Sequence, residues 1–134
     1  MNDADAIDFA LLLLRCGAGA VMLAHGINHI RPNIDGTARW FGSMGMKPPK
    51  VQAWLASITE IGSGILLLLG LLTPFAAAGI VGVMAVAWAI NHRGNGFFIF
   101  RPGEGWEYCA FLAVAAFSVA TIGAGKASLD HAIG

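Results

Sequence analysis

The sequence predicts an all-α membrane protein, a bundle of four transmembrane helices with two longer interfacial loops. Hydrophobic residues make up 57% of its 134 residues and charged residues only 12%. That charged share is about half of the quarter that is typical of soluble domains. The apolar residues form four continuous stretches, which do not alternate as barrel strands do. Because only helices and closed barrels satisfy backbone polar groups in lipid, continuous stretches predict helices.

The predicted spans are residues 7–28, 51–72, 74–90 and 107–122, within one domain of residues 1–134. A helix needs about 20 residues to cross a hydrocarbon core of ~30 Å, with about 17 as the lower limit. The first two stretches exceed this length and the last two lie near the minimum. The acidic start of the chain lacks the positive region of a cleaved signal peptide, so we interpret the first span as retained.

The connections between the spans differ in character. Thr73 and Pro74 are typical of an N-cap followed by proline in the first helical turn, which predicts a tight hairpin between the second and third spans. The connections 30–50 and 92–106 are longer. Their segments 35–46 and 94–100 place aromatic residues among glycines, which is typical of segments at headgroup depth.

The basic residues predict an orientation in the membrane. With four spans, both termini lie on one side and both long loops on the other. The terminal side holds only Lys126, whereas the loop side holds Arg31, Arg39, Lys47, Lys50, Arg93 and Arg101. The positive-inside rule therefore predicts cytoplasmic loops and outer termini in the inner (plasma) membrane.

Two ionisable residues are predicted near the middle of the membrane. Arg15 in the first span and Glu60 in the second lie within ~5 Å of each other in depth, by the helical rise per residue. An ion pair would offset part of the desolvation of both groups. Such a pair either locks two helices together or handles a ligand or a proton, and the sequence leaves both interpretations open.

A second polar group gathers at the loop-side ends of the spans. It consists of His25, Asn28, His29, Asn91, His92 and Glu107. His25 and His29 share one helix face at i, i+4. These residues either cap helix ends in contact with water or converge on a pocket for a quinone, a lipid headgroup or a neighbouring subunit.

Several other functions lack a signature in this sequence. The histidine spacing does not provide opposite axial ligands for haem, and no zinc ligand set or dinucleotide fingerprint is present. The formal net charge is zero, so we expect no nucleic-acid partner. Cys16 and Cys109 are predicted to differ in depth by more than ~10 Å, too far for a disulfide. We expect no metal and no cofactor other than a quinone.

The order of these motifs resembles the DoxX family of small four-helix membrane proteins. The matching features are Arg15, the segments 25–29, 41–45, 60–64 and 69–73, Glu107, and the closing segment 123–130. The closing Gly-x-Gly-x-x-Ser-Leu-Asp follows the last span as it does in that family. The resemblance implies a membrane role beside redox proteins, because the family's namesake belongs to a thiosulfate:quinone oxidoreductase and mycobacterial relatives are linked to oxidative-stress complexes.

Two functions follow as expectations. The first is a non-catalytic accessory subunit of a larger membrane complex, either a lipid transporter or a redox assembly. Small-residue faces around Ala76–Gly79 with Gly82, and at Gly62 and Gly64, favour this function, because they let helices approach closely. The alternative is a subunit of a quinone-linked oxidoreductase. Both functions place the chain among membrane lipids and larger protein partners.

Overall fold

The computed structural model describes residues 2–134, and these residues form helices and connecting loops without strands. The elements are α1 (Asp3–Ile30), α2 (Ile34–Ser43), α3 (Pro49–Leu69), α4 (Thr73–Ala87), the π-helical turn η1 (Trp88–His92), α5 (Glu107–Ile122) and α6 (Leu129–Ile133). The predicted all-α class is therefore confirmed.

Three helices are long and apolar enough to cross a membrane: α1, α3, and α4 continued through η1 to His92. The fourth predicted span is α5, a shorter apolar helix of 16 residues. The second span was predicted to reach residue 72, but α3 ends at Leu69 because Gly70 takes the left-handed conformation with φ 64°. Three spans by length are thus established, and the fourth crossing stays a prediction.

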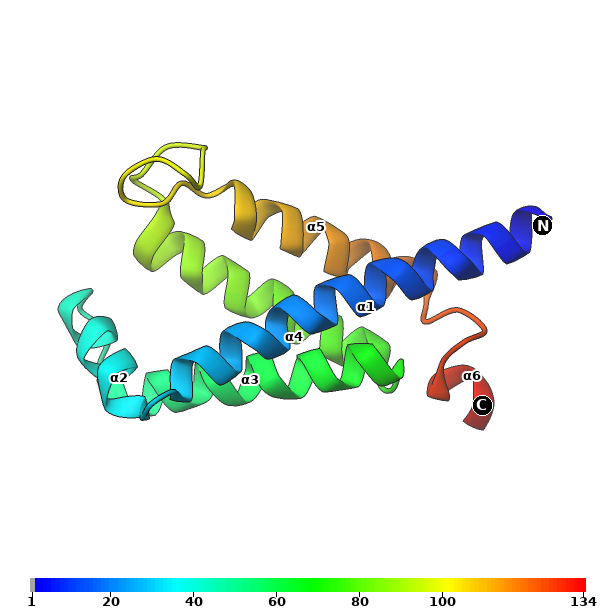
Figure 1. The fold of residues 1–134 in the computed structure, drawn as a ribbon, viewed down its shortest axis with the longest axis horizontal. Coiled ribbons are helices and arrows are strands. Elements are labelled where there is room, and N and C mark those ends of the chain that lie inside the picture. Colours follow the sequence, from blue (N-terminus) through cyan, green and yellow to red (C-terminus); the bar gives the residue numbers. More distant parts are fainter. Residues whose placement is uncertain (1) are drawn as a thin grey trace.

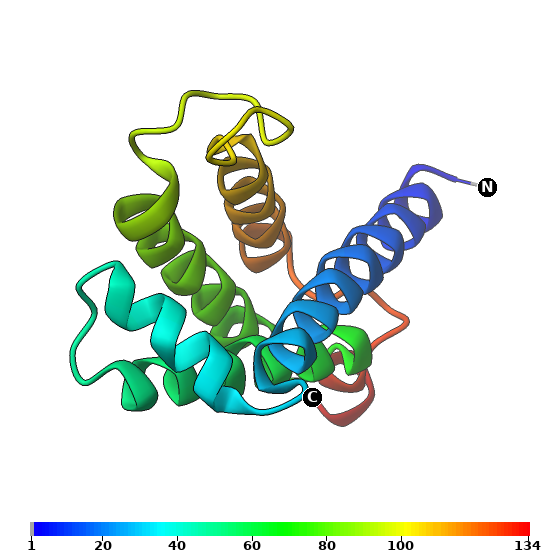
Figure 2. The same ribbon diagram turned by 60° about the vertical axis from the view of Figure 1, so that its left-hand side comes forward.

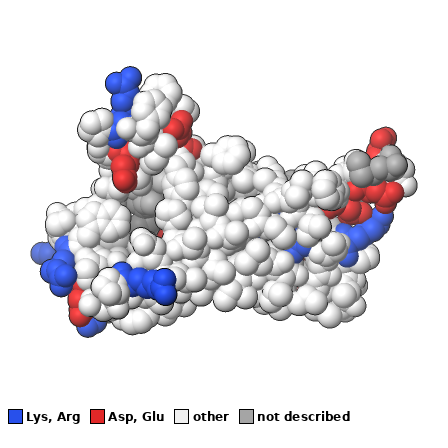
Figure 3. All heavy atoms as spheres, viewed as in Figure 1, with Lys and Arg blue, Asp and Glu red and all other residues white. Residues whose placement is uncertain are grey.

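The helices run side by side, so the connections gather at two opposite ends (Figures 1 and 2). The N-terminus, the α3–α4 turn and α6 lie at one end, which we call the terminal end. The α2 helix and the 93–106 loop lie at the other, which we call the loop end. In Figure 3 the charged side chains cluster at the two ends, and the surface between them is almost free of charge on this face. This distribution fits a molecule with an apolar middle.

α1 and α3 pack so closely that their backbones touch. A Cβ atom at Gly64 of α3 would lie 2.7 Å from the backbone nitrogen of Leu23 and 2.8 Å from the carbonyl oxygen of Gly19. A Cβ atom at Gly26 would lie 2.9 Å from the backbone nitrogen of Ile61. Larger side chains at these three glycines would push the helices apart. Gly64 was predicted to be such a contact; a Cβ atom at Gly62 would meet no atom within 4 Å.

The C-terminal end of α3 is held by a buried arginine from α1. The side chain of Arg15 is 1% exposed. Its Nη1 donates to the carbonyl oxygens of Leu67 at 2.9 Å and Leu68 at 3.1 Å, and its Nη2 donates to the carbonyl oxygen of Ala127. The last carbonyls of a helix lack intrahelical partners and carry partial negative charge, so a cation stabilises them. The guanidinium leaves no room for a Cβ atom at Gly70.

The N-terminal end of α4 is capped by Asp130, which lies far along the chain. Its Oδ1 accepts from the N–H of Leu72 at 2.8 Å and its Oδ2 from the N–H of Thr73 at 2.9 Å. The prediction that Thr73 is the N-cap was wrong, because the N-cap residue is Leu72, which has no side-chain acceptor. The Asp130 carboxylate supplies the acceptor that the local sequence lacks.

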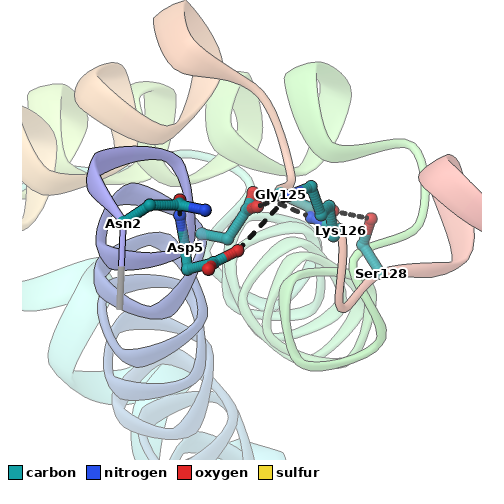
Figure 4. A network of polar contacts seen from close by, with 6 residues as sticks. Asn2, Asp5, Gly125, Lys126 and Ser128 are labelled. Atoms are coloured by element: carbon teal, nitrogen blue, oxygen red, sulfur yellow. Dashed lines mark hydrogen bonds and ion pairs between the residues drawn. The ribbon is translucent and has the colours of Figure 1, made fainter.

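The segment 123–134 also reaches the start of α1. Lys126 Nζ lies 3.1 Å from Asp8 Oδ2 and 3.6 Å from Asp5 Oδ1, and the Lys126 N–H donates to Asp8 Oδ1 at 3.1 Å. Figure 4 shows Lys126 between the first turn of α1 and the tail. The hydrogen bond to the Asp8 carboxylate raises the pKa of Lys126 above its ordinary value. The tail therefore ties α1 to the α3–α4 turn.

We predict that Asp130→Asn lowers stability by about 1 kcal/mol, because an amide keeps one acceptor oxygen but turns an NH2 group toward one of the two N–H groups that Asp130 caps. Burial raises the pKa of Asp130, but hydrogen bonds from the Thr73 and Leu72 N–H groups outweigh it and bring the pKa below its ordinary value. Because the pKa of Asp130 is lower in the folded state, the ionised carboxylate stabilises the fold. This stabilisation is fully present above the unfolded pKa of about 3.9, and it is lost as the pH falls through the folded pKa.

The measurement is unfolding in detergent as a function of pH. The difference in stability between wild type and Asp130→Asn should shrink below about pH 4. Asp35→Asn is the matched control. The hydrogen bond with Lys50 also lowers the pKa of Asp35, but Asp35 and Lys50 are both more than half exposed, so we expect this pair to add little stability. Equal losses for the two variants at neutral pH would contradict the capping role of Asp130.

Candidate functional site

A cavity of about 690 Å³ lies at the loop end, between α1, α3, α4 and the start of α5. Its volume is within the range of about 300 to 1,000 Å³ that is typical of small-molecule sites. The α2 helix and the residues that follow it cover it on one side, and η1 with the 93–106 loop on another. Figure 3 shows the surface hollowed between α2 and that loop.

The polar centre of the cavity is a pair between α1 and α3. His29 Nδ1 lies 2.9 Å from Glu60 Oε2, with the two side chains 16% and 5% exposed. The pair forms because Gly26 lets α1 approach α3 at this level, where its Cβ position lies 3.0 Å from the Glu60 Cβ. The contact is an ion pair when the imidazole is protonated, but its geometry is not that of a hydrogen bond, and neither atom has a hydrogen-bond partner within residues 2–134. With Nδ1 turned to the carboxylate, Nε2 is the nitrogen that can face a ligand.

The predicted pair of Arg15 and Glu60 does not form in the structure. Arg15 binds the carbonyls of Leu67 and Leu68, which lie about two turns beyond Glu60 toward the terminal end. The physical reason is that a guanidinium can be satisfied by the free carbonyls at a helix end and needs no carboxylate. Glu60 finds its partner in His29. The prediction compared only the depths of Arg15 and Glu60 along the membrane normal, and depth alone does not identify the groups that each side chain contacts.

Four of the six residues of the predicted polar group line the cavity: His25, His29, Asn91 and His92. The His25 ring lies 5.2 Å from the ring of Tyr108, centroid to centroid. The Tyr108 hydroxyl is buried and has no hydrogen-bond partner within residues 2–134. A ligand in the cavity could supply that partner, because Tyr108 is one of the lining residues.

His92 and Asn91 also hold the 93–106 loop. His92 Nδ1 lies 2.7 Å from the carbonyl oxygen of Glu104, which can only accept, so Nδ1 carries the proton. Its Nε2 then accepts from Asn91 Nδ2 at 3.4 Å. Asn95 Nδ2 donates to the Asn91 carbonyl at 2.7 Å. These bonds fix the loop against η1 and make it a wall of the cavity.

Asn28 and Glu107 were predicted to join this pocket, but the structure places them outside it. Glu107 Oε1 accepts from the N–H of Ile99 at 3.0 Å, so it stabilises the 93–106 loop. Asn28 is exposed on the outer face of α1. The reason is helical rotation, because each residue advances the helix by about 100° and Asn28 therefore points well away from its neighbour His29.

The rest of the cavity wall was not recognised as part of a site from the sequence. Trp40, Phe41, Met44 and Met46 form the apolar cover, and the Phe41 ring meets the His29 ring edge-on at 5.9 Å. Tyr108 was missed as well. One signal was available: it is the only tyrosine of the chain and follows Glu107 directly.

Within the described residues, no group of three or more His, Cys, Asp or Glu side chains lies close enough together to hold a metal ion. Both cysteines are free: Cys109 is buried and Cys16 half-buried. The arrangement instead offers a buried carboxylate facing an imidazole, an unpartnered tyrosine hydroxyl and an apolar cover. It can hold the polar head of an amphipathic molecule.

The apolar helices, with the charged side chains gathered at the two ends of the molecule, define a multi-pass α-helical membrane protein. A sequence model of the DoxX family matches residues 10–93, which is more than half of the chain, so the chain belongs to the DoxX family. The resemblance inferred from the motifs is thereby confirmed. No curated protein and no solved structure matches this chain.

We predict that His29 and Glu60 stabilise each other more strongly than an exposed pair does. Glu60→Ala should lower stability by about 1 to 3 kcal/mol, because it leaves a buried imidazole nitrogen without its partner. A double-mutant cycle of His29→Ala and Glu60→Ala, measured by unfolding in detergent, should give a coupling above about 1 kcal/mol. The matched cycle on the exposed pair Asp35 and Lys50 should give a smaller coupling, because water screens that pair. A coupling no larger than in the control pair would contradict the prediction.

Proposed function

We propose that the chain crosses the inner (plasma) membrane four times, with both long loops in the cytoplasm and both termini outside. α5 supports the fourth crossing, because its 16 residues extend about 24 Å and its outer face is apolar. Phe111, Val114 and Phe117 on that face are each more than 60% exposed, as expected of side chains in lipid. The six basic loop residues support the orientation.

The function that the geometry supports best is binding of a quinone, or of a molecule with similar chemistry, in the cavity. The observation that carries this proposal is the buried His29–Glu60 pair beneath an apolar cover at membrane depth. An ionisable group in a span is costly, so a pair facing a cavity favours a functional role. A quinone carbonyl can accept a hydrogen bond from the Tyr108 hydroxyl, or from His29 Nε2 when the imidazole is protonated, and its ring can lie against the aromatic cover.

In this role the chain is a binding subunit rather than an enzyme by itself. A quinone takes up electrons and protons together when it is reduced. The electrons would come from a redox partner in the same membrane complex, and the His29–Glu60 pair would pass a proton to the quinone oxygen. The cavity residues thus bind, orient and exchange protons.

The test is purification in a mild detergent, followed by solvent extraction and mass spectrometry of the bound molecules. We expect wild type to retain a quinone or another amphipathic molecule well above its level in the detergent-extracted membrane. Glu60→Gln should retain at least about tenfold less, a difference of about 1.4 kcal/mol, because it removes the carboxylate charge that faces His29 in the cavity.

Glu107→Gln is the matched control for this experiment, since it makes the same chemical change outside the cavity. It should retain the wild-type amount. A wild-type protein without any enriched amphipathic molecule would overturn the binding proposal.

A second candidate function is that of an accessory subunit, and the outer face of α1 favours it. Gly17, Ala20, Ala24 and Asn28 lie on this face at helical spacing and are exposed. A Cβ atom at Gly17 would meet no atom within 4 Å. Small residues followed by an amide are typical of faces that receive another transmembrane helix in lipid. The partner would be a subunit of a lipid transporter or of a redox assembly.

We predict that gentle extraction of wild type recovers a larger membrane protein in stoichiometric amount, and that Gly17→Leu loses it. A leucine at Gly17 fills the space that a partner helix would need, without disturbing this chain. Gly62→Leu on α3 is the control, since its Cβ also meets no atom within 4 Å. Loss with Gly62→Leu instead would move the interface to α3, and a wild type that purifies alone would refute the subunit role.

A further inference from the structure

We propose that the ligand enters the cavity sideways from the bilayer, through the gap between α3 and α4, and that its apolar tail leaves by the same gap. We call this gap the α3–α4 portal; its edges are Leu55 on α3 and Gly82 and Val86 on α4. The proposal rests on the proposed function and narrows its ligand to molecules with a polar head and a flexible tail.

The first observation is that α3 and α4 meet near the terminal end and part toward the loop end (Figures 1 and 2). Gly79 is their point of close contact: a Cβ atom there would collide with Ser63 Oγ and lie 3.3 Å from Thr59 Cγ2. One turn further along, a Cβ atom at Gly82 would meet no atom within 4 Å. The two helices therefore separate beyond Gly79.

The second observation is a gradient of exposure across the cavity lining of α4. Ala78, Gly82 and Val86 form an outer row at i, i+4 spacing, and all three are exposed. Gly79, Val83 and Ala87 form the next row inward, and all three are half-buried. On α3 the exposed Leu55 lines the same cavity as the buried Glu60. The cavity thus runs from the outer surface to the polar pair.

The third observation is where this opening lies. Leu55 and Val86 are 55% and 50% exposed, and both belong to helices that can span a membrane. The portal therefore faces hydrocarbon, whereas the hollow in Figure 3 lies at the charged loop end. A tail passing between Leu55 and Val86 would stay in lipid while the head reaches His29 and Glu60. Such a path avoids exposing the tail to water.

The test compares probes with and without a tail on protein reconstituted in nanodiscs. The probes are decylubiquinone, its tailless benzoquinone analogue, and a short-chain phosphatidylglycerol that represents a lipid headgroup. Binding is followed by quenching of tryptophan fluorescence, since Trp40 lines the cavity. Gly82→Leu narrows the portal, Val86→Phe narrows it from an exposed position without adding a tryptophan, and Gly62→Leu is the control in equally open space outside the cavity.

We expect both portal variants to weaken decylubiquinone binding by about tenfold, as when about two methylene groups lose their burial. The tailless analogue should bind wild type and variants alike, and Gly62→Leu should match wild type with every probe. If phosphatidylglycerol binds in place of the quinone and loses affinity in the portal variants, the portal is supported and the head is a phosphate ester.

Two outcomes separate the portal from the proposed function. If Glu60→Gln abolishes decylubiquinone binding while Gly82→Leu and Val86→Phe leave it within about twofold of wild type, the cavity binds the quinone but the portal is refuted. If none of the three probes binds wild type, both proposals are overturned.

Discussion

The close contact between α1 and α3 is the constraint on which the rest of the structure depends. Gly19, Gly26 and Gly64 bring the two backbones within van der Waals distance. At one end of this contact Arg15 reaches the last carbonyls of α3, and at the other His29 reaches Glu60. With α1 and α3 fixed to each other, α4 can touch α3 at Gly79 and part from it beyond. The cavity is the space that this arrangement leaves.

The two buried charged residues are stabilised by different means, and this separates structure from function. The terminal guanidinium nitrogens of Arg15 donate to backbone carbonyls, which are fixed parts of the fold. Glu60 faces an imidazole at 2.9 Å without a hydrogen bond between Nδ1 and Oε2, so its carboxylate is less completely paired. Only the second arrangement lines a cavity. Arg15, with Asp130, therefore holds the terminal end together, and the chemistry lies toward the loop end.

The all-α class and the positions of the apolar helices could be predicted from the sequence, because long continuous apolar runs are typical of transmembrane helices. The i, i+4 spacing of His25 and His29 also placed both on the cavity. The wrong predictions, the Arg15–Glu60 pair and the N-cap of α4, concern contacts between residues that lie far apart in the sequence. Arg15 and Glu60 were matched by depth and opposite charge, although helix-end carbonyls offer an arginine a good alternative. The Asp130 cap could not be predicted, because its acceptor and its donors lie far apart in sequence.

The two glycines of α4 show why the cavity reflects more than imperfect packing. Gly79 has no side chain because Ser63 occupies that space, so its identity follows from stability. Gly82 has open space beside it, and nothing in the fold prevents a larger residue there. A larger side chain would fill part of the cavity and add dispersion contacts. In a bundle that gains little from apolar burial in lipid, such contacts matter. An open glycine on the path to a buried ionisable pair is therefore better explained by a ligand than by packing.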